Sequence, residues 1–496
     1  MKPVFLSLKE FDATCDKRYG MQNEILMENA ARGMCDEILN ILKRQTKNKK
    51  KVIQIVCGSG DNGADGLALA RMLYDAASVK VVQVAEPKSA LCLVQTERLK
   101  KLNIPISNLV SECDILVDAF LGTGLNGTVR ENAAKVINEM NVVKAYKIAC
   151  DIPSGLNLYG QPSPVAFKAK ITLSAGALKV AFFSDAALDF VGKIKEIGLG
   201  LPANCYAPCE KADAWILTKP DMQLPVRTKK NTHKGTFGHA VVYLGEKEGA
   251  AILASSACLR FGAGLVTVCG NKHSAAMPAD LMYASKMLPS YSAYCVGPGL
   301  GSGAENIIEA FFKLSIFEKT VFDADALKTA ALAKRLPELN NCILTPHLKE
   351  FLLLVKNLCK LKALNIARFE SLTVQDIQER KLEFAKVFAT QFPHVVLVLK
   401  GAVTVIAHGE KAFFATSGTP ALAKAGSGDV LAGMLTALLA QGYDCEKAAI
   451  TAQLAHGYAS RLLSSYASTA SELIQALGKL ESLVAYSVND NDEMEA

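Results

Sequence analysis

The chain has 496 residues, of which half are hydrophobic and 21% are charged, and its formal net charge is +7 at pH 7. This length is too great for one ordinary core and predicts two globular domains. The charge is too weak over this length to indicate nucleic-acid binding, and no apolar run reaches the roughly 18 residues of a membrane span. We therefore expect neither nucleic acid nor a membrane as a partner. The 14 cysteines are scattered, which favours free thiols in the cytoplasm.

The first 200 residues alternate strand-like and helix-like patterns. A long helix is expected over 21–42, and further helical patterns occur at 67–77 and 131–140. Strands are expected at Val52–Cys57, Val79–Ala85, Ile115–Phe120, Tyr146–Cys150, Lys170–Ala175 and Lys193–Leu199. This alternation predicts an α/β fold, with a parallel sheet covered by helices on both faces.

The pattern breaks over 201–232, where prolines and polar residues predict a linker with the domain boundary near Lys219. Alternation then resumes in a second α/β domain. Its expected strands are Ala240–Leu244, Leu265–Cys269, Tyr294–Gly297, Thr320–Asp323, Cys342–Leu344 and Val395–Lys400, followed by a hairpin edge at Val403–His408 and Ala412–Ala415. Its expected helices are Gly249–Phe261, Ala304–Leu314, Asp429–Leu439 and Lys447–Leu462. The predicted domains are therefore 1–218 and 219–496.

The first predicted strand leads directly into Gly58-Ser59-Gly60-Asp61-Asn62-Gly63. This is the G-x-G-x-x-G spacing of a dinucleotide-binding site, which places a pyrophosphate at the N-terminus of the next helix. The carboxylates of Asp61 and Asp65 would repel a pyrophosphate at that position. The spacing alone is therefore weak support for a plain dehydrogenase.

Two further predicted strands carry an aspartate near or directly after their carboxyl ends, before a glycine-containing loop. Asp118 is followed by the loop Gly122–Gly127, and Asp151 is followed by Ser154. Because the carboxyl ends of parallel strands share one edge of the sheet, we expect these loops to meet. The glycine loop lets backbone N–H groups approach a phosphate. Asp118, Asp151 and Ser154 supply oxygens for a cation or a hydroxylated ring.

Together the segments CGSGDNGADG, VDAFLGTGLNG and DIPSGL resemble the NAD(P)H-hydrate epimerase domain over about residues 1–205. The resemblance implies a Rossmann-like fold, a potassium ion held by Asn62, Asp118 and Ser154, and Asp151 at the reacting ring. It also implies that the hydrated dinucleotide contacts Asp61, Asn62, Gly63, Ala64, Asp65, Gly122, Thr123, Gly124, Leu125, Asn126, Gly127 and Thr128. The family often has asparagine where this chain has Asp61 and glycine where it has Ala64.

Epimerisation of a hydrated ring explains the need for an acidic side chain. The C–O bond beside the ring nitrogen must break and re-form on the other face. A carboxyl group can protonate the leaving hydroxyl and later activate water. Asp151 is the catalytic candidate for this step.

The strongest motif of the second half is Gly426-Ser427-Gly428-Asp429, which opens a predicted apolar helix. Backbone N–H groups at such a helix start would hold an anion. Asp429, in the first turn, lies within reach of a hydroxyl that attacks a terminal phosphoryl group. The chain has no G-x-x-x-x-G-K-[ST] motif, so this is not a P-loop.

This motif resembles the anion hole of ribokinase-like proteins. With the segments HKGTFGH, GPGLG, FDADAL and LTPH, it resembles the NAD(P)H-hydrate dehydratase domain over about residues 225–485. The resemblance implies Asp429 as catalytic base and a hydrate pocket lined by Ala250, Gly299 and His347. It also implies nucleotide contacts from Lys400, Gly401, Ala402, Val403, Thr404, Gly426, Ser427 and Gly428. The chain departs from the family at Leu348-Lys349, where Pro-Gly is usual.

The combined expectation is a bifunctional repair enzyme for NADHX and NADPHX. One domain interconverts the R and S hydrates. The other transfers phosphate from ADP or ATP to the S hydrate, and phosphate then leaves to restore NAD(P)H. Magnesium is expected at the nucleotide phosphates and potassium in the first domain. The fused arrangement favours ADP, and we expect a cytoplasmic homo-oligomer.

Alternatives stay open at this point. A ribokinase-type small-molecule kinase would use the same Asp429 motif and release a stable phosphorylated product. A non-catalytic dinucleotide sensor would bind without turnover, which the intact motif disfavours. A plain dehydrogenase is disfavoured by the acidic first loop.

Overall fold

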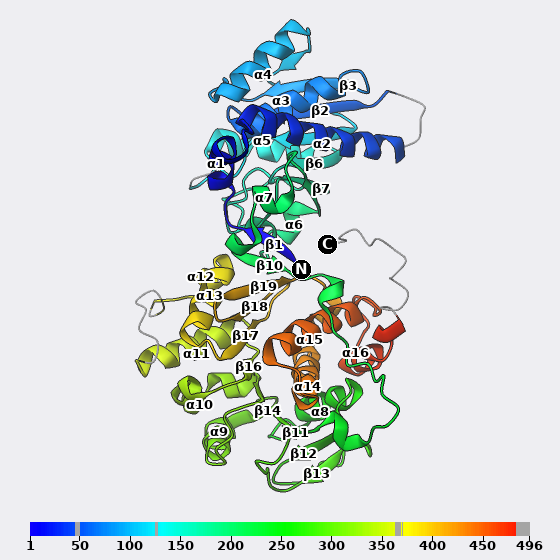
Figure 1. Ribbon diagram of the computed structural model, residues 1–496, viewed down its shortest axis with the longest axis vertical. Coiled ribbons are helices and arrows are strands. Elements are labelled where there is room, and N and C mark those ends of the chain that lie inside the picture. Colours follow the sequence, from blue (N-terminus) through cyan, green and yellow to red (C-terminus); the bar gives the residue numbers. More distant parts are fainter. Residues whose placement is uncertain (45–49, 125–126, 363–368, 370, 483–496) are drawn as a thin grey trace. The chain divides into compact units, whose positions relative to one another are not determined.

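The computed structural model of the chain divides into two compact α/β units (Figure 1). The residues that the structure describes are 1–44, 50–124, 127–362, 369 and 371–482. One unit runs from Pro3 to Ala214, and the other begins at Trp215 and includes Met1 and Lys2. None of the helices in the described residues has the length and hydropathy needed to span a bilayer.

The first unit alternates strands and helices. Its strands are β1 (Lys2–Phe5), β2 (Val52–Cys57), β3 (Ser78–Gln83), β4 (Ile106–Ser107), β5 (Ile115–Ala119), β6 (Tyr146–Cys150), β7 (Ile171–Ala175), β8 (Leu178–Lys179) and β9 (Lys193–Ile197). Its α-helices are α1 (Lys9–Tyr19), α2 (Asn23–Arg44), α3 (Asp61–Leu73), α4 (Ala90–Lys101), α5 (Glu131–Val142), α6 (Leu188–Val191) and α7 (Ala203–Tyr206). The main sheet is parallel, in the order β4–β3–β2–β5–β6–β7–β9, and β1 pairs in parallel with β8.

The strand order changes direction at β2, an inner strand that pairs with β3 on one side and β5 on the other. After β2 the chain continues to β3 on one side of the sheet, and after β5 it continues to β6 on the other side. A crevice therefore opens between the loop that follows β2 and the loop that follows β5. Ile53 and Ile55 enter the core with α2 and α3, whereas Val56 enters the core with α5. Helices cover both faces, which explains why these strands are continuous apolar runs in the sequence.

The second unit repeats this architecture with a larger sheet. Its strands are β10 (Ala214–Ile216), β11 (His239–Tyr243), β12 (Leu265–Cys269), β13 (Met282–Ala284), β14 (Ala293–Val296), β15 (Thr320–Phe322), β16 (Cys342–Leu344), β17 (Val395–Leu399), β18 (Thr404–His408) and β19 (Lys411–Ala415). Its α-helices are α8 (Glu248–Arg260), α9 (Ala304–Phe312), α10 (Ala330–Arg335), α11 (Leu348–Lys360), α12 (Val374–Glu379), α13 (Lys381–Gln391), α14 (Ser427–Ala440), α15 (Cys445–Ser460) and α16 (Ala470–Leu477).

The strands of this unit follow the order β13–β12–β11–β14–β15–β16–β17–β18–β19–β10. Pairing is parallel from β13 to β17, antiparallel from β17 to β19, and parallel between β19 and β10. Because β11 pairs with both β12 and β14, a second crevice is expected beyond the carboxyl ends of β11 and β14. The ends of β15, β16 and β17 lie along the same edge.

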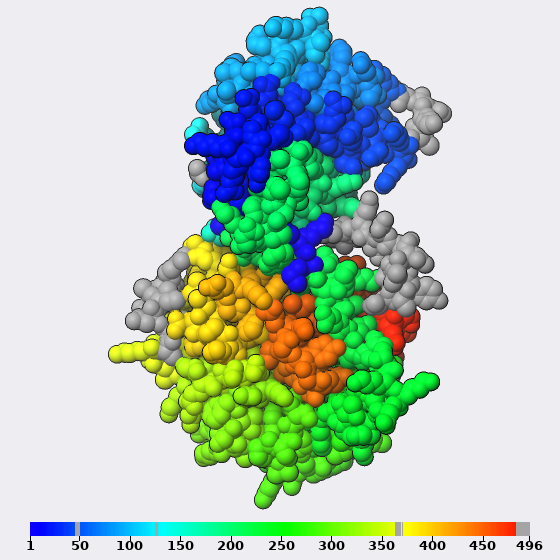
Figure 2. Space-filling model, viewed as in Figure 1, coloured from blue at the N-terminus to red at the C-terminus, as the bar shows by residue number. Residues whose placement is uncertain are grey.

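Helix α14 is buried along nearly its whole length and packs against α8. A Cβ atom at Gly433 would lie 2.0 Å from the carbonyl oxygen of Ala254, so only glycine allows this approach of the two helices. Helix α15 packs on α14 and on β17 and β18. Figure 2 shows α15, in orange, between yellow and green parts of the unit that are distant from it in sequence. The N-terminus of α14 is thereby held from several sides.

Two expectations from the sequence differ from the structure. The segment 201–232, expected to be a linker, contains α7 and β10, and β10 extends the sheet beyond β19. The hairpin of β18 and β19 is therefore not the sheet edge. Helix α3 also begins at Asp61 rather than Leu67. A three-residue strand and a helical turn rich in glycine and aspartate carry too little apolar periodicity to be recognised.

We expect Gly433→Ala to lower the free energy of unfolding of the second unit by about 1–3 kcal/mol, because the methyl group overpacks the contact with Ala254. Denaturation can be followed by fluorescence of Trp215, the single tryptophan, which packs against the core of this unit. Gly249→Ala in α8 is the matched control, because a Cβ atom there would have no neighbour within 4 Å. Equal stability of both variants would contradict the packing argument.

Candidate active sites

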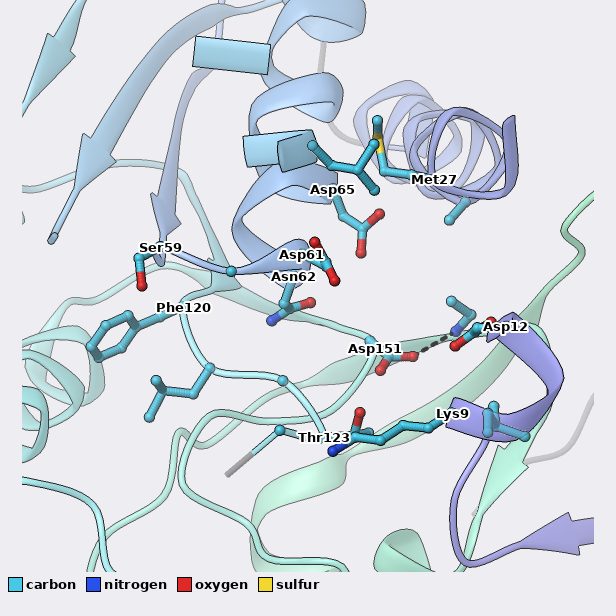
Figure 3. Close-up of a pocket in the computed structure, with 18 of the residues that line it drawn as sticks. Lys9, Asp12, Met27, Ser59, Asp61, Asn62, Asp65, Phe120, Thr123 and Asp151 are labelled. Carbon is cyan, nitrogen blue, oxygen red and sulfur yellow. Dashed lines mark hydrogen bonds between the residues drawn. The ribbon is translucent and has the colours of Figure 1, made fainter. Parts of the chain in front are cut away.

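The crevice of the first unit is a pocket of about 770 Å³, a size suited to a small-molecule ligand (Figure 3). It is lined by α1, α2, the first turn of α3 and the loop after β5. The lining includes these predicted residues: Asp61, Asn62, Asp65, Gly122, Thr123, Gly124, Thr128 and Asp151. Gly63 and Ala64 are buried in α3. Gly127 adopts a left-handed backbone, whereas Leu125 and Asn126 lie outside the described residues.

The glycines of the first loop allow the strand-end loops to pack closely. A Cβ atom at Gly58 would lie 1.9 Å from the carbonyl oxygen of Phe120, and one at Gly63 would lie 2.1 Å from the carbonyl oxygen of Gly58. A Cβ atom at Gly122 would lie 3.1 Å from the Cβ atom of Asn62. The spacing that resembles a pyrophosphate motif therefore serves here to bring two loops together.

Asp118 and Ser154 form a buried network behind this pocket. The Ser154 hydroxyl donates to Asp118 Oδ1 at 2.6 Å, and the Ser154 backbone N–H donates to Asp118 Oδ2 at 2.7 Å. Burial raises the pKa of Asp118 to about 6, although these hydrogen bonds oppose the shift. The buried side-chain amide of Asn62 has no hydrogen-bond partner within the described residues. An oxygen-rich site thus contains one amide oxygen available for a ligand.

Asp151 forms an ion pair that sequence reasoning missed. Its Oδ1 lies 2.7 Å from Nζ of Lys179 and also accepts the backbone N–H of Ala175 at 3.1 Å. The Lys179 side chain is only 4% exposed, and its Nζ donates to the hydroxyl of Ser174 as well. A lysine between the buried residues Leu178 and Val180 was the available signal, because a charge is rarely buried without a partner.

Several carboxyl groups gather in this pocket, as Figure 3 shows for Asp12, Asp61, Asp65 and Asp151. Burial raises the pKa of Asp65 well above its usual range, and the nearby charges of Asp151 and Asp61 add to this effect. Burial also raises the pKa of Asp12. Two carboxyl groups with raised pKa values therefore lie in the same pocket as the Asp151–Lys179 ion pair. Asp12 was missed because α1 precedes every motif of the domain.

The candidate site of the second unit lies at the ends of β15, β16 and β17. Asp323 follows β15 and is 2% exposed. Its Oδ1 accepts the hydroxyl of Thr345 at 2.7 Å and lies 2.8 Å from Nζ of Lys400. Burial disfavours the charged form of Lys400, but Asp323 and other nearby carboxylates outweigh it and raise the pKa. Sequence reasoning noted these segments but did not find that Asp323 anchors Lys400.

The first turn of α14 adjoins this ion pair. Gly426 has a φ of 88°, a left-handed conformation that favours glycine, and precedes the helix. A Cβ atom at Gly428 would lie 3.5 Å from Nζ of Lys400. Burial and the charge of Asp323 raise the pKa of Asp429 to about 6, while Lys400 opposes the shift. The helix start thus combines backbone N–H groups, a cation and a carboxyl group that can accept a proton.

The predicted hydrate-pocket residues come from separate strand ends. A Cβ atom at Gly299, after β14, would lie 3.1 Å from the Cβ of Ala250 in α8, so these two residues adjoin. His347 is the N-cap of α11, and its Nδ1 accepts the backbone N–H groups of Lys349 and Glu350. Burial lowers the pKa of His347 in spite of Glu350. His347 therefore has a capping role, and its half-exposed ring also remains available to a ligand.

The predicted nucleotide segment after Lys400 divides into two parts. Gly401 and Ala402 are exposed, whereas Val403 and Thr404 are buried in the sheet. The structure thus brings only the first two of these residues to the surface.

Within the described part of the chain, no group of three or more His, Cys, Asp or Glu side chains is arranged to hold a metal ion.

Comparisons with known proteins match both units. A family model described as NAD(P)H-hydrate dehydratase matches residues 240–480, and one described as YjeF-related protein N-terminus matches residues 23–181. The chain is 38% identical to the bifunctional NAD(P)H-hydrate repair enzyme Nnr of Helicobacter pylori, over 97% of this chain and all of that protein. It is 31% identical to the protein of the same name from Synechocystis, over 90% of this chain and 87% of that protein.

A solved structure is also similar to part of the chain. It is the ADP/ATP-dependent NAD(P)H-hydrate dehydratase from Bacillus subtilis, co-crystallized with ATP/Mg2+. The identity is 26% and the TM-score is 0.45, over 55% of this chain and 99% of that chain.

We expect Lys179→Met to lower the free energy of unfolding of the first unit by about 2–3 kcal/mol, because Asp151 would stay largely buried without its cation. Combining it with Asp151→Asn should recover about 1 kcal/mol or more of that loss. Urea denaturation followed by circular dichroism measures these changes, and Trp215 fluorescence identifies the transition of the other unit.

Lys195→Met provides the control for this ion pair. Lys195 pairs with Glu37 at 2.7 Å but is 39% exposed, so its loss should change the free energy of unfolding by less than about 1 kcal/mol. Equal effects of the two lysine substitutions would contradict the special role of the Asp151–Lys179 pair.

Proposed function

Since the chain belongs to the family of bifunctional NAD(P)H-hydrate repair enzymes, we propose that its first unit epimerises hydrated NAD(P)H and its second unit dehydrates it. The observation that carries the proposal is the presence of two separate sites, each with its own carboxyl group beside a lysine. Asp151 pairs with Lys179 in one site, and Asp429 adjoins Lys400 in the other.

Dehydration begins when the ring hydroxyl of the S hydrate attacks the terminal phosphoryl group of ADP or ATP. Asp429 accepts the hydroxyl proton, while Lys400 and the backbone N–H groups of Gly426–Gly428 bind the phosphate. The ring nitrogen then expels the phosphorylated oxygen as inorganic phosphate, and loss of a proton from the adjacent carbon restores NAD(P)H. Ala250, Gly299 and His347 would hold the hydrate, and Gly401–Thr404 would lie along the nucleotide.

Magnesium would accompany the nucleotide. Mg²⁺ in such sites is bound largely by substrate phosphates and water, so it needs no protein cage. Bound there, it would offset the charge of the phosphates. The steps assigned to Asp429 and Lys400 follow from their own geometry.

Epimerisation requires the C–O bond of the hydrated ring to break and re-form. Asp151 is the proposed group at the reacting carbon. Its ion pair with Lys179 supports a carboxylate there, which can stabilise positive charge on the ring and take a proton from the incoming water. The loop Gly122–Thr128 and the first turn of α3 would bind the rest of the dinucleotide.

The residues Asn62, Asp118 and Ser154 fit a potassium ion. All three offer oxygens, and the buried amide oxygen of Asn62 has no hydrogen-bond partner within the described residues. A monovalent cation bound there would offset the charge of Asp118 and hold the loop after β5 against α3. Asp151 lies outside this set of ligands.

The remaining assignments are also part of the proposal. NADHX and NADPHX are the proposed substrates. The phosphoryl donor is ADP or ATP, and the fused arrangement together with the overall resemblance favours ADP. The 14 free cysteines support a reducing compartment such as the cytoplasm. A homo-oligomeric state stays a prediction.

The central experiment is recovery of NADH absorbance from a mixture of R and S hydrated NADH, with magnesium and either ADP or ATP. The wild-type chain should restore NADH from both epimers. Asp151→Asn should restore it from the S epimer alone, because only epimerisation is lost. Asp429→Asn should abolish recovery but still interconvert the epimers. Absence of nucleotide-dependent recovery by folded wild-type protein would refute the proposed function.

The pH dependence of dehydration tests the role of Asp429. A base must be deprotonated, and the pKa of Asp429 is raised to about 6. The kcat/KM of dehydration of the S hydrate should therefore be constant above about pH 7 and fall about tenfold per pH unit below pH 6. A profile that stays flat down to pH 5 would exclude Asp429 as the base.

A further inference from the structure

Helix α1 places an additional carboxyl group in the pocket of the first unit. Asp12 lines this pocket together with Asp61, Asp65 and Asp151. Figure 3 shows Asp12 on the side of the pocket next to Asp151. Asp12 lies before the region, residues 23–181, that the family model of this unit matches.

Asp12 is held in position by a buried tyrosine from another helix. The hydroxyl of Tyr206, in α7, donates to Asp12 Oδ1 at 2.5 Å. Tyr206 is 4% exposed, and its ring lies 6.2 Å from the ring of Phe11. A Cβ atom at Gly176 would lie 2.4 Å from the Tyr206 ring, so glycine at this position makes room for the tyrosine. The orientation of the Asp12 carboxyl group is therefore fixed before a ligand binds.

The two carboxyl groups at this end of the pocket have opposite environments. Asp151 has a cationic partner, Lys179, and accepts the backbone N–H of Ala175. Burial and the negative charges of Asp151 and Asp61 raise the pKa of Asp12, while Tyr206 and Lys179 oppose that shift. The ionisable groups that face Asp12 are Cys15 on its own helix, Asp61 and Asp65 of α3, Asp151, Lys179 and Tyr206. Such a separation of environments assigns acid and base roles to paired carboxyl groups.

We propose that Asp12 is a further catalytic residue of the epimerisation, in which it protonates the hydroxyl group that leaves the hydrated ring. This inference rests on the proposed function. The proton moves from the Asp12 carboxyl group to the hydroxyl oxygen, the C–O bond breaks, and water leaves. The lone pair of the ring nitrogen forms a C=N bond, and Asp151 stabilises the resulting cation.

Re-addition of water completes the step. A water molecule adds to the other face of the same carbon, the C=N electron pair returns to nitrogen, and Asp151 takes the released proton. Transfer of this proton to Asp12 through solvent restores the starting state. No oxidant, reductant or nucleotide is consumed, so the reaction runs without the second unit.

The first test is Asp12→Asn in the full chain, with interconversion of purified R and S hydrated NADH followed chromatographically without adenine nucleotide. Asparagine keeps an oxygen that accepts the Tyr206 hydroxyl, so the helix contact is retained. The rate of interconversion should fall at least 100-fold, the range for loss of a general acid. Nucleotide-dependent dehydration of the S epimer should be unchanged, because that reaction belongs to the second unit, and the circular dichroism spectrum of the variant should match that of the wild type.

Asp16→Asn is the matched control, because Asp16 lies on the same helix and is exposed. This variant should interconvert the epimers at the wild-type rate. An Asp12→Asn chain that retains wild-type epimerisation would overturn the inference and leave the proposed function intact. A folded wild-type chain that does not interconvert the epimers would overturn both.

Tyr206→Phe gives a second test, because its expected effect on the pH profile would not occur if Asp12 had only a structural role. The hydrogen bond from Tyr206 stabilises the charged form of Asp12, so its loss raises the pKa of the acid. The alkaline limb of the epimerisation pH profile should therefore move upward by about one pH unit, because Asp12 stays protonated to higher pH. A uniform loss of rate at every pH, without movement of this limb, would overturn the inference.

Discussion

Parallel pairing of buried strands is the constraint on which both sites depend. In each unit the carboxyl ends of adjacent parallel strands meet at one edge of a sheet, and the chain changes direction at one strand in its middle. Polar residues that are distant in sequence, such as Asp118 and Ser154 or Asp323 and Lys400, become neighbours for this reason. The strands are largely apolar, and most site residues lie at their carboxyl ends or in the loops and helix starts that follow them.

Close backbone approaches set the geometry of these edges. Gly58 and Gly63 let the loops after β2 and β5 pack together, and Gly433 lets α14 approach α8. A Cβ atom at any of these positions would be 2.1 Å or less from a backbone carbonyl oxygen. The glycines of this chain therefore act mainly by admitting neighbouring backbone. Gly122 and Gly124 differ in that they line the pocket of the first unit.

Electrostatic pairing distinguishes the carboxyl groups within each site. Lys179 lies beside Asp151, whereas Asp12 has a tyrosine partner and negative neighbours. In the second unit Lys400 is anchored by Asp323, and burial and the charge of Asp323 raise the pKa of Asp429. Identical side chains thus acquire different protonation behaviour from their partners and their burial. One architecture can in this way support two different reactions on the same kind of substrate.

The sequence by itself determined the class of fold, the longer strands of both sheets and the motif residues near the strand ends; the short strands β1, β4, β8 and β13 were not predicted. Apolar runs, glycine loops and the aspartates that follow strands are local features, so Asp118, Asp151 and Asp429 could be recognised without a structure. The strand β10 and the early start of α3 could not, since short or polar segments carry little periodicity.

Only the tertiary structure decided which side chains are partners. Lys179, Asp12 and Tyr206 lie outside the motifs, and their roles arise from contacts between elements far apart in the chain. His347 lies within a motif, but its capping of α11 became visible only in the structure. A pattern in sequence reports the burial and local geometry of one element. The pairing of charges and hydrogen bonds depends on which elements pack together, and that information is absent from any single segment.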